Sequence, residues 1–182
     1  MNIRLKLAKI SVPVFMKKKI LDELFLLTAD AFQSEMPDLK GRSFKERLDR
    51  YARFTQGEAE KALFQGRDLQ GIKNRLFQSA QSLGRKLRKS FRISTTEEVM
   101  AAARILYLAI GIDFWGNDQG EIAIQRCLFS RYYSPDVCAL ISSLDEGILA
   151  GLASGGELSF EQRLTEGKNS CRAKFVFKES IK

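Results

Sequence analysis

Histidine is absent from this sequence of 182 residues. Its absence excludes the usual pairing of a cysteine nucleophile with an imidazole base. Cysteine is scarce as well. The three residues at 127, 138 and 171 are odd in number and too widely spaced for the disulfide framework of a small secreted protein. We therefore expect reduced thiols and a cytoplasmic location.

Long apolar runs are also lacking, and no stretch approaches the ~18 apolar residues of a membrane-spanning helix. The run "ISVPVFM" at 10–16 is short, contains a proline and leads into three lysines at 17–19, which does not fit a signal peptide. A phosphate-binding glycine loop is missing, because "GLASGG" at 151–156 follows a predicted helix instead of preceding one. The composition is that of a soluble globular protein.

Positive charge is concentrated in one half of the chain. Residues 1–92 hold 21 Lys and Arg against 10 Asp and Glu, a net charge of +11, whereas residues 93–182 hold 9 against 12, a net charge of −3. We predict a basic helical lobe over 1–92 and an α+β domain over 93–182, packed into one compact unit. The basic surface can be an ordinary solvated helical face or can bind an anionic partner such as nucleic acid or anionic lipid. The lack of a nucleic-acid-binding motif favours the solvated face.

Hydrophobic periodicity predicts four helices in the first 110 residues. Apolar residues at intervals of three and four indicate helices over 17–35, 43–64, 67–92 and 98–109. Capping boxes are expected at Ser43 with Glu46 and at Thr95 with Glu98.

Short β-branched and aromatic runs predict strands in the second half. These runs are "IGIDFW" (110–115), "EIAIQRCLF" (121–129), "LSFEQRLT" (158–165) and "CRAKFVFK" (171–178). Turn sequences join them into two hairpins, and a helix over 134–152, with Ser134 as cap and Pro135 at its start, lies between them. The predicted fold class is α+β: an N-terminal helical lobe followed by an antiparallel four-stranded sheet of two hairpins with an intervening helix.

The predicted helix over 134–152 places a charged residue on an apolar face. At 100° per residue, Cys138 and Asp145 lie about 20° apart, within the arc of leucine, isoleucine and valine side chains. A buried cysteine needs no special explanation, whereas a buried carboxylate must be paired, hydrogen-bonded or protonated, or must face a polar pocket. Asp145 can therefore be structural, bonded to loop N–H groups or paired with an arginine such as Arg163. It can equally belong to a ligand pocket.

The cysteines allow two kinds of chemistry. Cys138 lies in the first turn of its helix, where the helix dipole lowers a thiol pKa and burial raises it. It is therefore a candidate nucleophile, with Asp145, Glu146 or a water activated by them as base. Cys171 points toward the core by strand alternation, and Cys127 lies on a mixed strand face that can line a pocket. A zinc site of three thiols completed by Asp145 or water is only weakly indicated, because no two cysteines are close in sequence. We predict no cofactor and no metal, with zinc as the alternative.

The order of these residues resembles a known family, the L-2-amino-thiazoline-4-carboxylic acid hydrolase-like proteins. The similarity covers about residues 100–178 and rests on Cys127, Pro135, Cys138, Asp145, Arg163, Thr165, Gly167, Cys171 and Phe175. It implies an α+β fold with N-terminal helices and ring-opening hydrolysis of a cyclic C=N bond that yields a carbamoyl-cysteine product. The architecture is also distantly similar to 4-vinyl reductase-type sensor domains.

The resemblance leads to the first functional hypothesis, a hydrolase acting on a small cyclic amidine-type substrate. Cys138 and Asp145 would be its catalytic residues. Its substrate-binding residues would be Cys127, Arg163, Thr165 and Cys171, the arginine holding a substrate carboxylate. The second hypothesis is a non-catalytic sensor module that binds a small molecule or a metal, and the third is nucleic-acid binding through the basic helices. A homo-oligomer is compatible with each hypothesis.

Overall fold

The computed structural model of the chain describes residues 13–178 and has the expected α+β fold. Within these residues the helices α2 (Val14–Phe32), α3 (Phe44–Phe64), α4 (Leu69–Phe91) and α5 (Thr96–Ala109) come first. They are followed by β1 (Ile112–Gly116), β2 (Glu121–Cys127), η1 (Leu128–Arg131), α6 (Pro135–Ile141), α7 (Ser143–Ala153), β3 (Gly156–Gln162), η2 (Leu164–Glu166) and β4 (Cys171–Phe177). The first three residues of the apolar run at 10–16 lie outside the described part. None of the described helices is long and apolar enough to cross a membrane.

The four strands form one antiparallel sheet in the order β1-β2-β4-β3. Each predicted hairpin is present, and β2 pairs with β4 to join them, with Ile122 opposite Ala173. Alternation along β4 buries Cys171, Ala173 and Phe175 and leaves Arg172 exposed. The prediction of two hairpins in one antiparallel sheet is confirmed.

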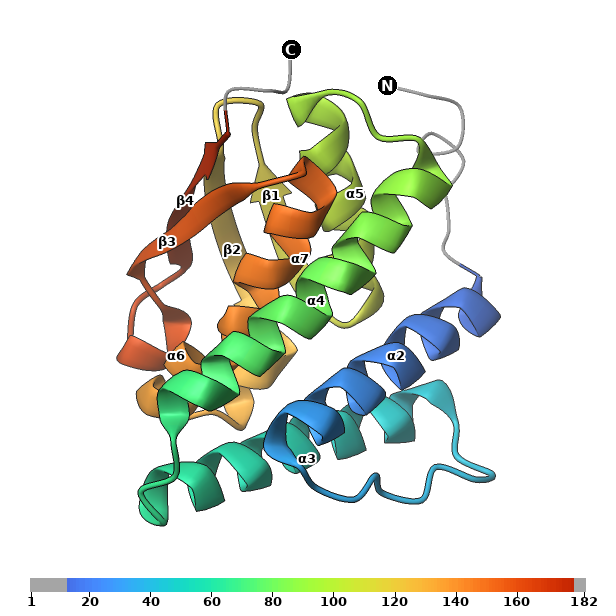
Figure 1. Cartoon of the computed structure of the whole chain (residues 1–182), viewed down its shortest axis with the longest axis vertical. Coiled ribbons are helices and arrows are strands. Elements are labelled where there is room, and N and C mark those ends of the chain that lie inside the picture. The colour runs from blue at the N-terminus through green and yellow to red at the C-terminus, as the bar shows by residue number, and fades with distance from the viewer. Residues whose placement is uncertain (1–12, 179–182) are drawn as a thin grey trace.

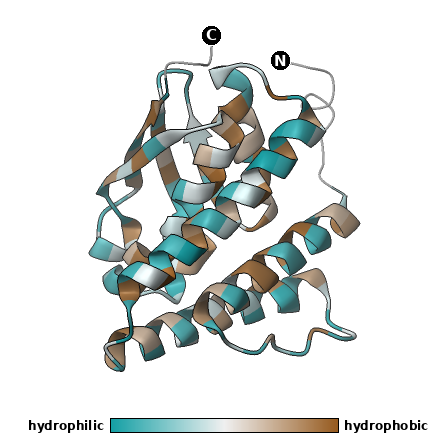
Figure 2. Ribbon diagram, in the orientation of Figure 1, coloured by the Kyte–Doolittle hydropathy of each residue, from teal (hydrophilic) through white to brown (hydrophobic). Residues whose placement is uncertain are grey.

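The helices cover one face of this sheet in successive layers (Figure 1). Helices α5 and α7 pack on the strands, α4 crosses the outer side of α7, and α2 and α3 lie to one side, where α2 contacts α4 and α3 contacts α6. Hydrophobic residues concentrate where these layers meet (Figure 2), and the largest buried side chains include Phe25, Phe32, Phe114 and Phe175. The division into two parts at residue 92 stays a prediction, although α4 on one side of that boundary packs along α7 on the other.

Two of the three predicted caps are present in full. The Ser43–Glu46 capping box forms at the start of α3, and Ser134 accepts a hydrogen bond from the backbone N–H of Val137 at 3.3 Å. At α5, the Thr95 hydroxyl accepts from the backbone N–H of Glu98 at 3.2 Å. The reciprocal half of that capping box is wrong, because the Glu98 carboxylate instead accepts from the backbone N–H and the hydroxyl of Ser94.

The helix expected over 134–152 is divided at Ser142 into α6 and α7. The Ser142 hydroxyl donates to the carbonyl oxygen of Cys138 at 2.7 Å, a contact with the preceding turn that bends helices. The bend does not separate the two residues that the helical wheel placed together. Cys138 on α6 and Asp145 on α7 line the same cavity.

The contact between α4 and α7 is the most extensive between any two described elements. It depends on glycines: a Cβ atom at Gly151 would lie 2.3 Å from the Gln81 carbonyl oxygen, and one at Gly84 would lie 2.5 Å from the Ile148 carbonyl oxygen. Only hydrogen at these positions lets the two backbones approach so closely. The Arg88 guanidinium on α4 then donates to the Leu152 carbonyl oxygen at 2.6 Å near the end of α7.

We predict that Gly151→Ala lowers the free energy of unfolding by about 1–3 kcal/mol, because the added methyl group must push α4 away from α7. The matched control is Gly57→Ala on α3, where a Cβ atom would meet nothing within 4 Å. That change should stabilise the protein by about 0.5–1 kcal/mol, because alanine favours a helix interior over glycine. Urea unfolding of both variants measures the difference, and a neutral Gly151→Ala would contradict the close-packing argument.

Candidate functional site

A cavity of about 90 Å³ lies between the sheet and the α5, α6 and α7 helices, and Leu24 of α2 and Tyr51 of α3 line its remaining side. Its wall is mainly apolar and includes Leu24, Ile110, Leu144 and Ile148. A space of this size can hold several water molecules or a small organic group. The cavity is the place where most of the predicted site residues meet.

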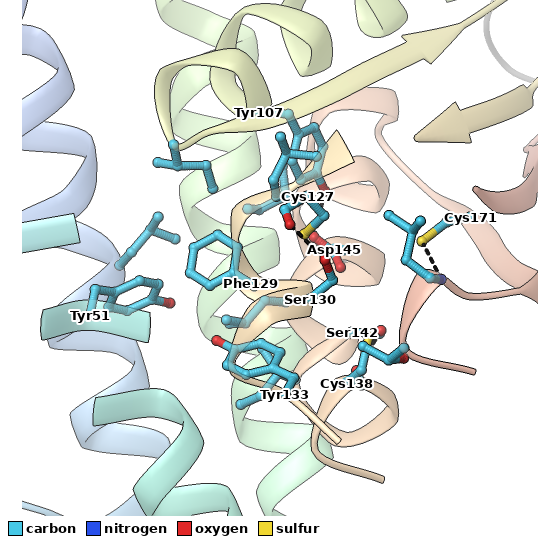
Figure 3. Close-up of a pocket in the computed structure, with 18 residues that line it drawn as sticks. Tyr51, Tyr107, Cys127, Phe129, Ser130, Tyr133, Cys138, Ser142, Asp145 and Cys171 are labelled. Atoms are coloured by element: carbon cyan, nitrogen blue, oxygen red, sulfur yellow. Dashed lines mark hydrogen bonds between the residues drawn. The ribbon is translucent and has the colours of Figure 1, made fainter. Parts of the chain in front are cut away.

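Five of the six predicted site residues line this cavity, although they come from five different elements. They are Cys127 at the end of β2, Cys138 on α6, Asp145 on α7, Thr165 on η2 and Cys171 at the start of β4. Figure 3 shows Asp145 and Cys127 close together beneath Tyr107, with Cys138 and Cys171 on other sides of the space. The strand alternation that predicted a buried Cys171 and a pocket-lining Cys127 is confirmed.

Arg163, the sixth predicted residue, does not line the cavity. Its guanidinium lies over the Phe160 ring at 4.1 Å from the centroid, and Nη2 donates a long hydrogen bond of 3.5 Å to the Ser142 hydroxyl. It makes no ion pair with Asp145 among the described residues, so the suggested Arg163–Asp145 pairing is wrong. Its Nε atom is buried and lacks a hydrogen-bond partner among those residues.

The partner of Asp145 is Tyr107, a residue that the sequence reasoning missed. The Tyr107 hydroxyl donates to Oδ1 of Asp145 at 2.8 Å, and the Tyr107 ring is stacked on Phe114 with the centroids 4.9 Å apart. A buried tyrosine needs a partner for its hydroxyl, and a buried aspartate needs a donor. The sequence therefore contained one signal for this contact: a tyrosine and an aspartate, both predicted to be buried, each of which needs a hydrogen-bond partner.

The protonated, neutral form of Asp145 is more favoured in this cavity than it would be in water. Burial raises the pKa of Asp145 from its ordinary 3.8 to about 6, while the Tyr107 hydrogen bond and the charge of Arg163 act in the opposite direction. Protein encloses this side chain, yet it keeps intermediate exposure because part of its surface faces the cavity. Oδ2 has no hydrogen-bond partner among the described residues.

Burial also decides the protonation of the thiols. It raises the pKa of Cys127 to about 12 and raises the pKa of both Cys138 and Cys171. Thr165 lies close enough to Cys138 to favour the thiolate, but its buried hydroxyl makes no hydrogen bond of normal geometry. At Cys138 the effect of burial on the thiol pKa therefore exceeds that of the helix dipole. All three thiols are protonated near neutral pH.

Most other polar atoms around the cavity are already committed to protein partners. The Tyr51 hydroxyl bonds Thr28 at 3.1 Å, and the Tyr133 hydroxyl bonds Thr55. The Ser130 hydroxyl donates to the Cys127 carbonyl oxygen at 2.8 Å. The groups left for a bound molecule are Oδ2 of Asp145, the Thr165 hydroxyl and the thiols of Cys127 and Cys138.

The described residues contain no group of three or more cysteine and carboxylate side chains arranged to hold a metal ion. One of the thiols is also engaged, since Cys171 Sγ accepts a hydrogen bond from the backbone N–H of Leu164 at 3.3 Å. The zinc alternative thus gains no support from this geometry.

A wider groove of about 550 Å³ adjoins the cavity on the side of β2 and η1. The two spaces share Ile112, Cys127, Ser130 and Leu164 in their walls. These four side chains therefore lie between the two spaces, and a molecule bound in the groove is next to the cavity.

Comparisons with known proteins give little further direction. No family model matches the chain, and no curated protein matches it. Among solved structures, an H-NOX domain from Shewanella oneidensis, determined by NMR in an Fe(II)CO ligation state, is similar with a TM-score of 0.42 and 13% identity, covering 90% of this chain and 98% of that one. A structural similarity this distant does not assign the chain to a family or a function. The resemblance to the thiazoline hydrolase-like family stays a prediction.

We predict that Asp145→Asn stabilises the protein above about pH 6. Because the folded-state pKa of Asp145 lies above its ordinary value, the acid contributes stability that is fully present below about pH 4 and is lost as the pH rises through about 6. Asparagine keeps the oxygen that accepts from Tyr107 and removes the charge, so the gain at neutral pH should be on the order of 2 kcal/mol.

Thermal or urea unfolding between about pH 4 and pH 8 measures this gain. Asp118→Asn, at an exposed turn position, is the control and should leave the pH dependence unchanged. An Asp145→Asn variant that is less stable than the unmodified protein at neutral pH would show that the ionised carboxylate supports the fold.

Proposed function

We propose that the cavity binds a small, largely apolar molecule that carries one protonated nitrogen group, such as a cyclic amidine. The observation behind this proposal is the carboxylate of Asp145, which faces an apolar space with Oδ2 unpaired. A cation beside it would restore the pairing that a buried charge requires. The ring of such a molecule would contact the leucine and isoleucine side chains of the wall.

Tyr107 acts in this proposal as a positioning residue. Its hydroxyl occupies Oδ1 of Asp145 and directs Oδ2 toward the bound group. Its ring is held in turn by the stacked Phe114. The carboxylate is thus fixed before the ligand arrives, which lowers the ordering cost of binding.

The expected result is that 2-aminothiazoline, a small cyclic amidine used as the probe, binds more tightly as the pH rises through about 6, because Asp145 ionises over that range. Asp145→Asn should weaken binding at neutral pH by about ten- to a hundredfold, the value of a charge-assisted hydrogen bond. Calorimetric titration at several pH values gives both results.

The neutral ring thiazole and the Asp118→Asn variant serve as controls in that titration. Thiazole should bind weakly and without pH dependence, and Asp118→Asn should bind the amidine normally. Equal affinity for both rings, or an unchanged Asp145→Asn variant, would refute the cation-binding role.

Hydrolysis of such a ligand is the second candidate function, favoured by the pKa of Asp145. A carboxyl group that titrates near pH 6 is suited to take a proton from water and return it to a leaving group. The raised pKa of Cys138 disfavours a thiolate nucleophile, so Cys138 would act as an oriented thiol beside the attacked carbon. Under this mechanism Asp145, and not a cysteine, carries the reaction.

We predict that, if the protein opens the ring of 2-aminothiazoline-4-carboxylate, Asp145→Asn lowers kcat by about 10²–10⁴-fold. Cys138→Ala should retain most of the activity, because the thiol is protonated and is not the attacking group. A fluorogenic reagent for primary amines detects the amino group that cleavage of the ring C–N bond releases. Complete loss of activity in Cys138→Ala with a folded protein would reinstate the nucleophile. If neither the unmodified protein nor any variant turns the substrate over, while amidine binding is normal, the hydrolase function is excluded and the binding function stands.

A further inference from the structure

The first two turns of α2 combine exposed apolar and basic side chains. Val14 and Phe15 keep 59% and 70% of their surface exposed, and after Met16 come the partly exposed Lys17 and Lys18 and the exposed Lys19. No acidic residue lies in the first turn, and no carboxylate among residues 13–178 forms an ion pair with these lysines. Large apolar side chains left in water beside cations call for a partner that accepts both.

The preceding sequence continues the same composition. Residues 1–19 contain six Lys and Arg and no Asp or Glu, and their apolar residues include isoleucine, leucine, valine and phenylalanine. The charge pattern of this stretch is therefore not limited to α2. It is typical of segments that lie on an anionic bilayer, where apolar side chains enter the headgroup boundary and lysines contact the lipid phosphates.

The last turns of α4 add positive charge at the same end of the molecule. Ile20 of α2 lines a small cavity of about 20 Å³ together with Leu83 and Leu87 of α4, so these two helix ends are neighbours. Figure 1 shows the start of α2 and the end of α4 on the same side of the fold. On the outer face of α4, Arg85, Lys86 and Lys89 are exposed.

We propose that this basic-apolar end, formed by Val14, Phe15, Lys17–Lys19, Arg85, Lys86 and Lys89, docks the protein on an anionic phospholipid surface. Charge complementarity alone would equally suit nucleic acid. The exposed Val14 and Phe15 favour the bilayer, since a phosphate backbone offers an apolar side chain nothing to enter. Figure 2 shows hydrophobic residues at the start of α2 and hydrophilic residues along the outer face of α4.

Flotation with lipid vesicles tests this surface in the full chain. Vesicles of phosphatidylcholine with about 30% phosphatidylserine should bind the protein, and pure phosphatidylcholine should not. Replacing Lys17, Lys18 and Lys19 together by Gln should weaken binding on the order of a hundredfold, at about fivefold for each lysine. Phe15→Ser should weaken it by roughly tenfold through lost apolar contact.

The matched control replaces three exposed lysines elsewhere, Lys40, Lys45 and Lys168, by Gln, which changes the net charge equally. This control should bind the vesicles like the unmodified protein. Equal losses in both triple variants would overturn the proposed surface and indicate a non-specific charge effect. Tighter binding to duplex DNA than to the anionic vesicles, unaffected by Phe15→Ser, would also overturn it in favour of nucleic acid. Circular dichroism confirms that each variant is folded.

Discussion

The close packing of α4 against α7 through Gly84 and Gly151 is the constraint on which the site depends. Gly147 and Gly151 lie one turn apart on the face of α7 that meets α4, and Asp145 lies about 200° around the helix from Gly147. The contact that fixes α7 from outside therefore directs Asp145 inward, toward Tyr107 on α5. A shift of α7 away from α4 would therefore also move Asp145 and the part of the cavity wall that α7 supplies.

Desolvation then sets the chemistry inside the cavity. A helix dipole contributes about 0.3–1 kcal/mol to a nearby charge, whereas full burial can shift a pKa by several units. This difference in size explains why Cys138 stays a thiol despite its position in the first turn of α6. The same effect brings Asp145 to a pKa of about 6, where a carboxyl can gain or lose its proton near neutral pH. Among the cavity-lining groups with shifted pKa values, the Asp145 carboxyl is thus the one that titrates near neutral pH, whereas the three thiols stay protonated there.

The parts of this structure that sequence could predict are those governed by local periodicity. The apolar stripe of α4, the alternation along β4 and the shared face of Cys138 and Asp145 follow from helix and strand geometry alone. The Tyr107–Asp145 bond joins residues 38 positions apart, and no local pattern encodes the relative rotation of their helices. The role of Gly151 was invisible for the same reason, because a glycine becomes essential only when another backbone approaches it. The bend at Ser142 could not be predicted either, because it depends on the hydrogen bond of the Ser142 hydroxyl to the preceding turn, which the sequence does not specify.

An ionisable residue in the wall of a buried cavity lowers the stability of the fold, and this loss of stability bears on function. An apolar residue at position 145 would extend the apolar cavity wall that includes Leu144 and Ile148, without any penalty for a buried charge. A carboxylate with a raised pKa instead destabilises the folded state at neutral pH, as groups at binding and catalytic sites often do. A cationic ligand would offset that penalty only when it occupies the cavity, so occupancy and stability become linked. The strength of that linkage would depend on Asp145 being ionised, so the proposed ligand would stabilise the protein more at neutral pH than at acid pH.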